Sequence, residues 1–277
     1  MDLEPLTDLR DPVVVIAFSG WNDAANAASD VVEHLVAQYP GDELMPIDDE
    51  HYFDFQATRP VLHRAADGPW IEWPSIRLRR LRHPERDIVA VLGPEPNLRW
   101  RSFCRAVVER VRGLRPDLVV TIGAMLSDTP HSRPFPTGLY TTNETLRERL
   151  GFETSSYEGP VGIVGVLGQA VEQAGVPSAA LWVSVPHYVA SPPNPQAQLQ
   201  LLGRLESVLG IDIDHGDLEP RAQEWVEAVD AIAGQDPDIE EYIEQLEEAR
   251  DQEVVEENSG DRIAAEFERY LRGQRDG

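Results

Sequence analysis

The sequence contains no lysine, so all 24 of its basic residues are arginine. This absence excludes a phosphate-binding Gly-Lys-Ser/Thr loop, a Schiff-base lysine and a serine–lysine catalytic dyad. The chain also has a single cysteine, Cys104, which excludes an intramolecular disulfide and a multi-thiolate metal site. Cys104 lies on an apolar stripe at helical spacing, where we expect a small core residue.

Long apolar runs are missing as well. No run approaches the roughly 20 residues that a membrane-spanning helix needs. The N-terminal stretch MDLEPLTDLRD is acidic and lacks the basic and apolar regions of a secretory signal. We therefore expect a cytoplasmic protein without a membrane partner. The apolar content, 42% of 277 residues, is sufficient for a large core.

Charge is abundant, of one dominant sign and unevenly placed. The formal net charge of −25 opposes nonspecific binding to nucleic acid, so no nucleic-acid partner is expected. Residues 214–277 carry 21 carboxylates and 6 arginines, whereas residues 77–115 carry 11 of the 24 arginines. Two interpretations stay open: solvated faces that keep the chain soluble, or surfaces that steer self-association and partner docking.

The stretch 12–40 predicts a strand, a turn and a helix. Val13 to Phe18 is a β-branched apolar run, Ser19 to Asp23 interrupts it, and apolar residues then recur at helical spacing up to Leu35. A strand without polar alternation indicates a parallel sheet that is covered on both faces. Either Asn22 or Asp23 can cap the helix.

The same unit is expected again at residues 88–112, from 118 onward, at 161–175 and at 179–209. Such repetition predicts a layered α/β domain, which we assign to residues 1–210. Residues 71–81 have the composition of a hairpin strand. From residue 211 only helical patterns follow, with stripes around Trp225, Ile239 and Ile263, so residues 211–277 are predicted to form an acidic helical subdomain.

Polar residues gather directly after the predicted strands, where ligands of α/β sheets usually bind. The candidate ligand or interface residues are Ser19, Trp21, Asn22, Asp23, Asp128, His131, Arg133 and His187. Asp128, His131 and Arg133 bring acid, base and anion-binding groups together. They follow no G-x-S-x-G elbow, however, and loop capping or interface hydrogen bonding explains them better than catalysis does.

Two further sequence patterns match neither a metal-binding nor a cofactor-binding motif. We therefore expect no metal and no cofactor. The carboxylates Asp48, Asp49, Glu50 and Asp54 lack the spacing and the glycine of a calcium-binding loop. The glycines between Gly159 and Gly168 do not match G-x-G-x-x-G, and close backbone packing accounts for them better than phosphate binding does.

Several stretches together resemble the PAC2 family, the relatives of proteasome assembly chaperone 2, and in particular an actinobacterial branch with a C-terminal helical extension. They are VVVIAFSGWNDAANAASDVVEHL, FDFQATRP, VLGPEPNLRWRSF, TIGAMLSDTPHSRP, YEGPVGIVG and ALWVSVPHYVASPPNPQA, and they extend from Pro12 to Leu209. The resemblance implies a three-layer α/β/α core similar to the phosphorylase/hydrolase-like fold. It also implies a homo-oligomer, with a trimer as one expected form.

The resemblance further implies a non-enzymatic chaperone or scaffold role, with proteasome subunits as the expected protein partner. Archaeal relatives dock through a C-terminal hydrophobic-Tyr-X tail, whereas this sequence ends Gln-Arg-Asp-Gly and has its last tyrosine at Tyr270. The alternative is a nucleoside-like small-molecule binding protein, or a hydrolase or phosphorylase that uses the strand-end loops. The residues leave enzyme activity open, and the non-enzymatic role is favoured.

Overall fold

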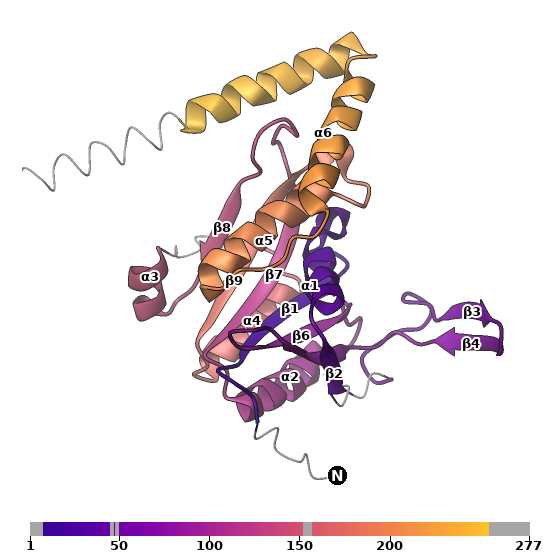
Figure 1. The fold of residues 1–277 in the computed structure, drawn as a ribbon, viewed down its shortest axis with the longest axis vertical. Helices are drawn as coiled ribbons and strands as arrows, with labels where there is room; N and C mark the ends of the chain where they lie inside the picture. The colour runs from indigo at the N-terminus through magenta and orange to yellow at the C-terminus, as the bar shows by residue number, and fades with distance from the viewer. Residues whose placement is uncertain (1–7, 45–46, 48–49, 152–156, 255–277) are drawn as a thin grey trace, which may run out of the picture.

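A seven-stranded mixed sheet forms the centre of the molecule, in the order β2-β5-β6-β1-β7-β9-β8. The computed structural model describes residues 8–44, 47, 50–151 and 157–254. Figure 1 shows the sheet between two layers of helices. Its strands are β1 (Val13–Ser19), β2 (Gly41–Leu44), β5 (Arg77–Arg82), β6 (Asp87–Pro94), β7 (Leu118–Ser127), β8 (Thr137–Tyr140) and β9 (Ser178–Pro186).

The four inner strands, β6, β1, β7 and β9, run parallel. Parallel strands are buried on both faces, which explains why residues 13–18 are apolar without alternation and are all buried. The antiparallel strands β2, β5 and β8 complete the two sides of the sheet. Because the inner strands share one direction, the loops that follow them meet at one edge of the sheet.

Each face of the sheet is covered by a pair of helices. The first face packs against α1 (Ala27–Gln38) and α5 (Pro195–Leu209), and the second packs against α2 (Trp100–Leu114) and α4 (Ile163–Gln173). On the second face Phe103 of α2 contacts Phe18 edge to face, with 5.7 Å between the ring centroids. Burial of a side chain of this size contributes about 2–3 kcal/mol, so the amphipathic stripes fix the three-layer α/β/α architecture.

The C-terminal helices lead back to the strand ends. Helix α6 (Leu218–Ala233) packs against α5, and its Leu218 joins the first core. Figure 1 shows the chain rising along α6 and then turning across the end of the molecule at which β7 and β9 stop. Residues 237–254 form that second helix. Within the described residues, no helix is both long and apolar enough to cross a bilayer.

A separate hairpin projects from the side of the molecule (Figure 1). Strands β3 (Val61–Ala65) and β4 (Gly68–Glu72) pair only with each other, in a two-stranded sheet. Elsewhere, α3 (Glu144–Leu150) begins with Asn143, whose side chain accepts a hydrogen bond from the Leu146 amide. Short 3-10 turns follow β1 at Ala24–Asn26 and β9 at His187–Val189.

The structure corrects two of the expected elements. Residues 161–175 contain no strand: α4 begins at Ile163, because the apolar residues there have helical spacing and bury one side of the helix. Residues 71–81 are divided between β4 and β5, which belong to different sheets. The helical stripe expected around Ile263, and Asp48 and Asp49, lie outside the described residues.

Candidate interaction site at the strand ends

At the end of β1, Asp23 is a structural residue. Its Oδ1 accepts hydrogen bonds from the Ala28 and Ser29 amides at 2.8 and 3.1 Å, and its Oδ2 accepts one from the Ser29 hydroxyl at 2.5 Å. These bonds satisfy the first amides of α1, so the predicted capping role is confirmed for Asp23. The side chain is 5% exposed, which leaves little of it for a ligand.

Two acidic side chains near the start of α1 have raised pKa values. Burial raises the pKa of Asp23, although hydrogen bonds from Ser29 and Ala28 act in the opposite direction. Burial, followed by the negative charges of Asp23 and Glu33, raises the pKa of Asp30 to about 6. The folded protein therefore disfavours the ionised form of both carboxyl groups.

Backbone hydrogen bonds of the neighbouring residues join the end of β1 to β7 and to the residue that follows β6. The Ala124 amide of β7 donates to the Asn22 carbonyl at 2.8 Å, and the Glu95 amide donates to the Ser19 carbonyl at the same distance. Glu95 also accepts a hydrogen bond from the Ile163 amide, the first of α4. A Cβ at Gly162 would lie 1.9 Å from Asn22 Oδ1, which supports the predicted close packing of this glycine.

Trp21 differs from its neighbours because 64% of its side chain is exposed. Its ring lies against Gly162, beside the exposed Val161, and β7 carries two more exposed apolar residues just past the Asn22–Ala124 contact. We call these residues the strand-end patch: Trp21, Met125, Leu126 and Val161. As successive residues of β7, Met125 and Leu126 point to opposite faces of the sheet, so these side chains lie around the strand ends and not on one face. Exposed apolar side chains gathered at one end of a molecule are candidates for contact with another protein.

At the ends of β7 and β9, His131 is the centre of a buried hydrogen-bond network. Its Nε2 lies 2.8 Å from Asp230 Oδ1 of α6, and its Nδ1 lies 2.8 Å from the Tyr188 hydroxyl. The same hydroxyl oxygen accepts the His131 backbone N–H at 2.8 Å. A neutral imidazole that donates from Nε2 and accepts at Nδ1 satisfies every one of these groups.

The His131 side of this network is closed to solvent, whereas the Asp230 side chain is 59% exposed. His131 is 1% exposed, and the ring of Trp225 on α6 packs edge to face against it. Burial raises the pKa of Tyr188 to about 12, so its hydroxyl remains a proton donor at all physiological pH values. His131 is thus positioned to hold α6, and its ring nitrogens are not available to a substrate.

Arg133 and Ser132 bind the helix formed by residues 237–254. The Arg133 guanidinium donates two hydrogen bonds to Asp251, Nε to Oδ1 and Nη2 to Oδ2, both at 3.0 Å. Ser132 donates to Glu247, which also lies within 3.4 Å of Arg133. Arg133 holds the pKa of Asp251 below its usual range, as expected for a bidentate ion pair.

Asp128 and His187 form the most accessible pair at this end. Asp128 Oδ1 lies 3.2 Å from His187 Nδ1, and both side chains are largely solvated. Tyr242 of the C-terminal helix packs edge to face on His187, with 5.9 Å between the ring centroids. In general-base catalysis an aspartate can orient the imidazole of a histidine. The group packed against the His187 imidazole, however, is the ring of Tyr242.

The eight residues predicted from the sequence therefore separate into two groups. Ser19, Trp21, Asn22 and Asp23 lie around the end of β1, whereas Asp128, His131, Arg133 and His187 converge with the C-terminal helices. Sequence reasoning missed the partners of the second group: Tyr188, Asp230, Tyr242, Glu247 and Asp251. They are ordinary members of a tyrosine-containing loop and of acidic helices, and no local motif distinguishes them.

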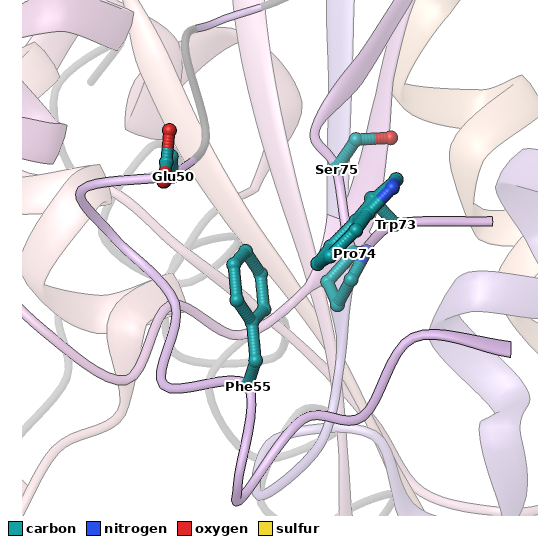
Figure 2. Close-up of a pocket in the computed structure, with 5 residues that line it drawn as sticks. All are labelled: Glu50, Phe55, Trp73, Pro74 and Ser75. Carbon is teal, nitrogen blue, oxygen red and sulfur yellow. The ribbon is translucent and has the colours of Figure 1, made fainter. Parts of the chain in front are cut away.

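A cleft of about 440 Å³ lies apart from the strand ends, at the base of the β3–β4 hairpin. Figure 2 shows Phe55 and Trp73 on either side of it, with Glu50, Pro74 and Ser75 completing its lining. The rings of Phe55 and Trp73 are 4.9 Å apart. Among the described residues, no group of three or more histidine, cysteine or acidic side chains could hold a metal ion.

Comparisons with known proteins agree with this architecture. A model of the PAC2 family matches residues 17–233. A PAC2 family protein from Streptomyces avermitilis is 43% identical, with a TM-score of 0.78 and coverage of 84% of this chain and 99% of that one. A proteasome-assembly chaperone homologue from Mycobacterium tuberculosis is 40% identical, with a TM-score of 0.77 and coverage of 83% and 99%.

More distant structures share the fold. Pyrococcus furiosus PbaB, an archaeal proteasome activator, is 16% identical, with a TM-score of 0.64 and coverage of 81% of this chain and 94% of that one. A search of curated proteins gave no match.

Proposed function

Because this chain belongs to the PAC2 family, we propose that it is a non-enzymatic assembly chaperone or scaffold that binds other proteins. The expected partner is a proteasome subunit, in line with the 40% identical proteasome-assembly chaperone homologue. Self-association is part of the proposal. The main support for the proposal within the molecule is that polar residues at the strand ends bind other parts of the same chain.

The observation that carries the proposal is that the acid, base and cationic groups after β7 bind the chain's own C-terminal helices. His131 is engaged by Asp230 and Tyr188, and Arg133 by Asp251. A substrate could reach His131 only after α6 had moved, and the buried imidazole would then lose the partner of its Nε2. An unpaired buried donor costs about 1–3 kcal/mol, so the arrangement favours a structural role.

The surface that remains open at this edge of the sheet is apolar. The strand-end patch presents a tryptophan and three aliphatic or thioether side chains. Tryptophan is enriched among the residues that dominate the energy of protein interfaces, and methionine adapts its shape to a partner. We assign the strand-end patch to the docking of the protein partner, with Trp21 as its anchor.

Affinity purification of the full-length chain from its native host tests both parts of the proposal. We expect proteasome subunits, identified by mass spectrometry, to co-purify with the wild type. Recovery should fall at least about tenfold for Trp21→Ala, since the loss of an interface tryptophan commonly costs more than about 1.4 kcal/mol. Ile232→Ala, an equally exposed position on α6, is the matched control and should bind as the wild type does.

Two results would contradict the proposal in different ways. A wild-type chain that brings down no proteasome subunit and no other protein would argue against the assembly role. A partner recovered equally by the wild type and by Trp21→Ala would leave that role in place and would remove the strand-end patch as its docking surface.

A further inference from the structure

Helix α2 presents a cationic face to solvent on a strongly acidic molecule. Residues 99–115, which comprise α2 and one flanking residue at each end, contain six arginines and one carboxylate, so this stretch carries a net charge of +5. The whole chain carries −25. The apolar stripe of α2 packs on the second face of the sheet, so the opposite side of the helix lies in the outer layer of the molecule (Figure 1).

Three of these arginines form a row along the helix axis. Arg101, Arg105 and Arg112 are separated by four and seven positions, and at 3.6 residues per turn they fall within about 40° of one another around the helix. At a rise of about 1.5 Å per residue, their Cα positions span about 16 Å. All three residues are exposed. We call them the arginine row.

The arginine row lacks ion-pair partners within the protein. In the part of the chain that the structure describes, none of its three members forms an ion pair, and Arg105 donates only to Ser102 Oγ, at 3.3 Å. Exposed arginines elsewhere do have such partners, because Arg77 lies 2.6 Å from a carboxylate oxygen of Glu33. The positive charge of the row is therefore available to another molecule.

The stability of the free protein does not explain the arginine row. The first amides of a helix carry a partial positive charge, which disfavours a cation in the first turn. Arg101 occupies that turn of α2, where no acidic residue accompanies it and no side chain caps the helix. Arg99 precedes it at a φ of 55°, a conformation that glycine or asparagine adopts more easily. A bound anion would neutralise the positive charge that these residues concentrate.

The acidic remainder of the chain limits which anion can bind. Guanidinium groups bind phosphates and carboxylates alike, often through two parallel hydrogen bonds. A nucleic acid carries charge along its whole length, about one per 1.7 Å of duplex, so most of it would lie over acidic surface and be repelled. A short run of aspartates and glutamates can end where the row ends. The arginine row therefore fits an acidic protein segment better than a nucleic acid.

A second copy of this chain is a poorer occupant than a different protein. Two copies that each carry −25 repel each other over most of their surfaces. The described C-terminal helix has many carboxylates, but Asp251 and Glu247 already bind Arg133 and Ser132 of the same chain. The charge of the row is thus best matched by an acidic segment of another sequence.

We infer that the arginine row docks a short run of aspartate and glutamate residues of a partner protein. The inference deepens the proposed function and rests on it only for the premise that the occupant is a protein. The row lies on a helix, whereas the strand-end patch lies after the strands, so the two surfaces can be tested separately. Charge complementarity at the row would speed association and make it sensitive to salt.

Fluorescence anisotropy of a labelled oligoglutamate peptide, measured with the full-length protein, tests the inference. We expect the wild type to bind a peptide of about ten residues, which is long enough to cover the row. Arg101→Glu/Arg105→Glu should weaken binding at least about tenfold, because two attractive charges become repulsive. Arg204→Glu/Arg221→Glu is the matched control: it makes the same charge change at exposed positions of α5 and α6 and should stay within about twofold of the wild type.

Urea denaturation of a single variant separates docking from folding. An acidic residue in the first turn is favoured by the helix dipole, so Arg101→Glu should keep or raise the urea midpoint while it weakens peptide binding about threefold or more. A lower midpoint together with lost binding would show that Arg101 has a structural role and would overturn the inference.

Two further measurements test the chemistry of the occupant. Peptide binding should be largely lost when NaCl is raised from about 0.05 to 0.5 M, because salt screens exposed charges. Binding that persists at high salt would contradict docking by charge. A labelled single-stranded RNA serves as the second probe, and RNA that binds through the row while the peptide does not would make the row a nucleic-acid site and the inference wrong.

The remaining outcomes distinguish this inference from the proposed function. Peptide binding through the row by a chain that brings down no protein from its host would support the row and argue against the assembly role. Proteasome subunits that co-purify equally with the wild type and with Arg101→Glu/Arg105→Glu would leave the assembly role in place and remove the row. A change in native mass on the same double substitution would make a second copy the occupant and would also overturn the inference.

Discussion

The polar residues that follow the neighbouring strands β1 and β7 bind different parts of the chain. After β1, Asp23 bonds to Ala28 and Ser29, five and six positions further along the chain. After β7, His131 and Arg133 bond to Asp230 and Asp251, 99 and 118 positions away. The first set is local and buried; the second joins the sheet to the C-terminal helices.

This difference indicates that the fold requires the bonds of Asp23. It could exist without the bonds of His131 and Arg133. The bonds of Asp23 fix the start of α1, which covers the first core. The bonds of His131 and Arg133 hold α6 and the helix of residues 237–254 at the strand ends, while the start of α6 is anchored in the first core by Leu218. We therefore expect substitutions after β1 to change global stability, and substitutions after β7 to change local opening of the C-terminal helices.

The largest effect is expected for Asp23→Ala. The substitution leaves the Ala28 and Ser29 amides without their acceptor in a buried site, and the Ser29 hydroxyl with the Asn26 carbonyl alone, which should lower the free energy of unfolding by about 2 kcal/mol. Urea denaturation measures the loss. Asp23→Asn, which keeps an acceptor oxygen and removes a buried charge, should lose much less, and equal losses in the two variants would contradict the capping role.

Asp30→Asn should act in the opposite direction and more weakly. The folded pKa of about 6 exceeds the unfolded value of 3.8, so the ionised carboxylate destabilises the fold as pH rises from about 4 through 6. Since Asp30 is partly solvated, about 1 kcal/mol should be regained at pH 8 and none below pH 4. Unfolding measured across this range tests the sign, with the exposed Glu224→Gln as a control that should show no such pH dependence.

Asp230→Ala should loosen α6 without unfolding the domain. It removes the acceptor of His131 Nε2, a loss of about 1 kcal/mol, which corresponds to about a fivefold increase in local opening. Hydrogen exchange should rise by that factor in residues 218–254, while the urea midpoint stays near that of the wild type. A matching fall in the midpoint would place α6 within the global folding unit, and an equal increase in exchange for the exposed Glu224→Ala would show that the effect does not come from the His131–Asp230 contact.

Arg133→Ala should have the smallest effect. Its ion pair with Asp251 is exposed, so we expect less than about a twofold increase in exchange near residue 251 at moderate salt. Arg133 lowers the pKa of Asp251, so the contribution of the pair is present at neutral pH and is lost as pH falls below the usual range of aspartate. An increase in exchange larger than that of Asp230→Ala would reverse the ranking of the two contacts.

The local part of this architecture could be predicted from the sequence. The apolar run after Pro12 and the helical stripe that carries Cys104 correspond to the observed β1 and α2. The resemblance to the PAC2 family is confirmed by the match over residues 17–233. The expected strand within residues 161–175 was wrong, because the apolar residues from Ile163 onward have helical spacing and bury one side of α4.

The candidate site could be predicted only as a set of positions. Parallel strands place their carboxyl ends together, and Asp128 after β7 accordingly lies 3.2 Å from His187 after β9. The partners of that group come from acidic helices about a hundred residues later, where every face offers carboxylates. Which of them would meet His131 depends on the direction in which α6 leaves α5, and that direction is set by the burial of Leu218 and Ala222.

The central claim is that this protein acts by binding proteins, and a native mass spectrum of the assembly purified gently from its own host tests it most directly. We predict a homo-oligomer that carries an identified proteasome subunit. An oligomer that carries only a stoichiometric small molecule, released when Asp128, His131 and Arg133 are substituted together, would contradict the claim and would establish the strand ends as a ligand site.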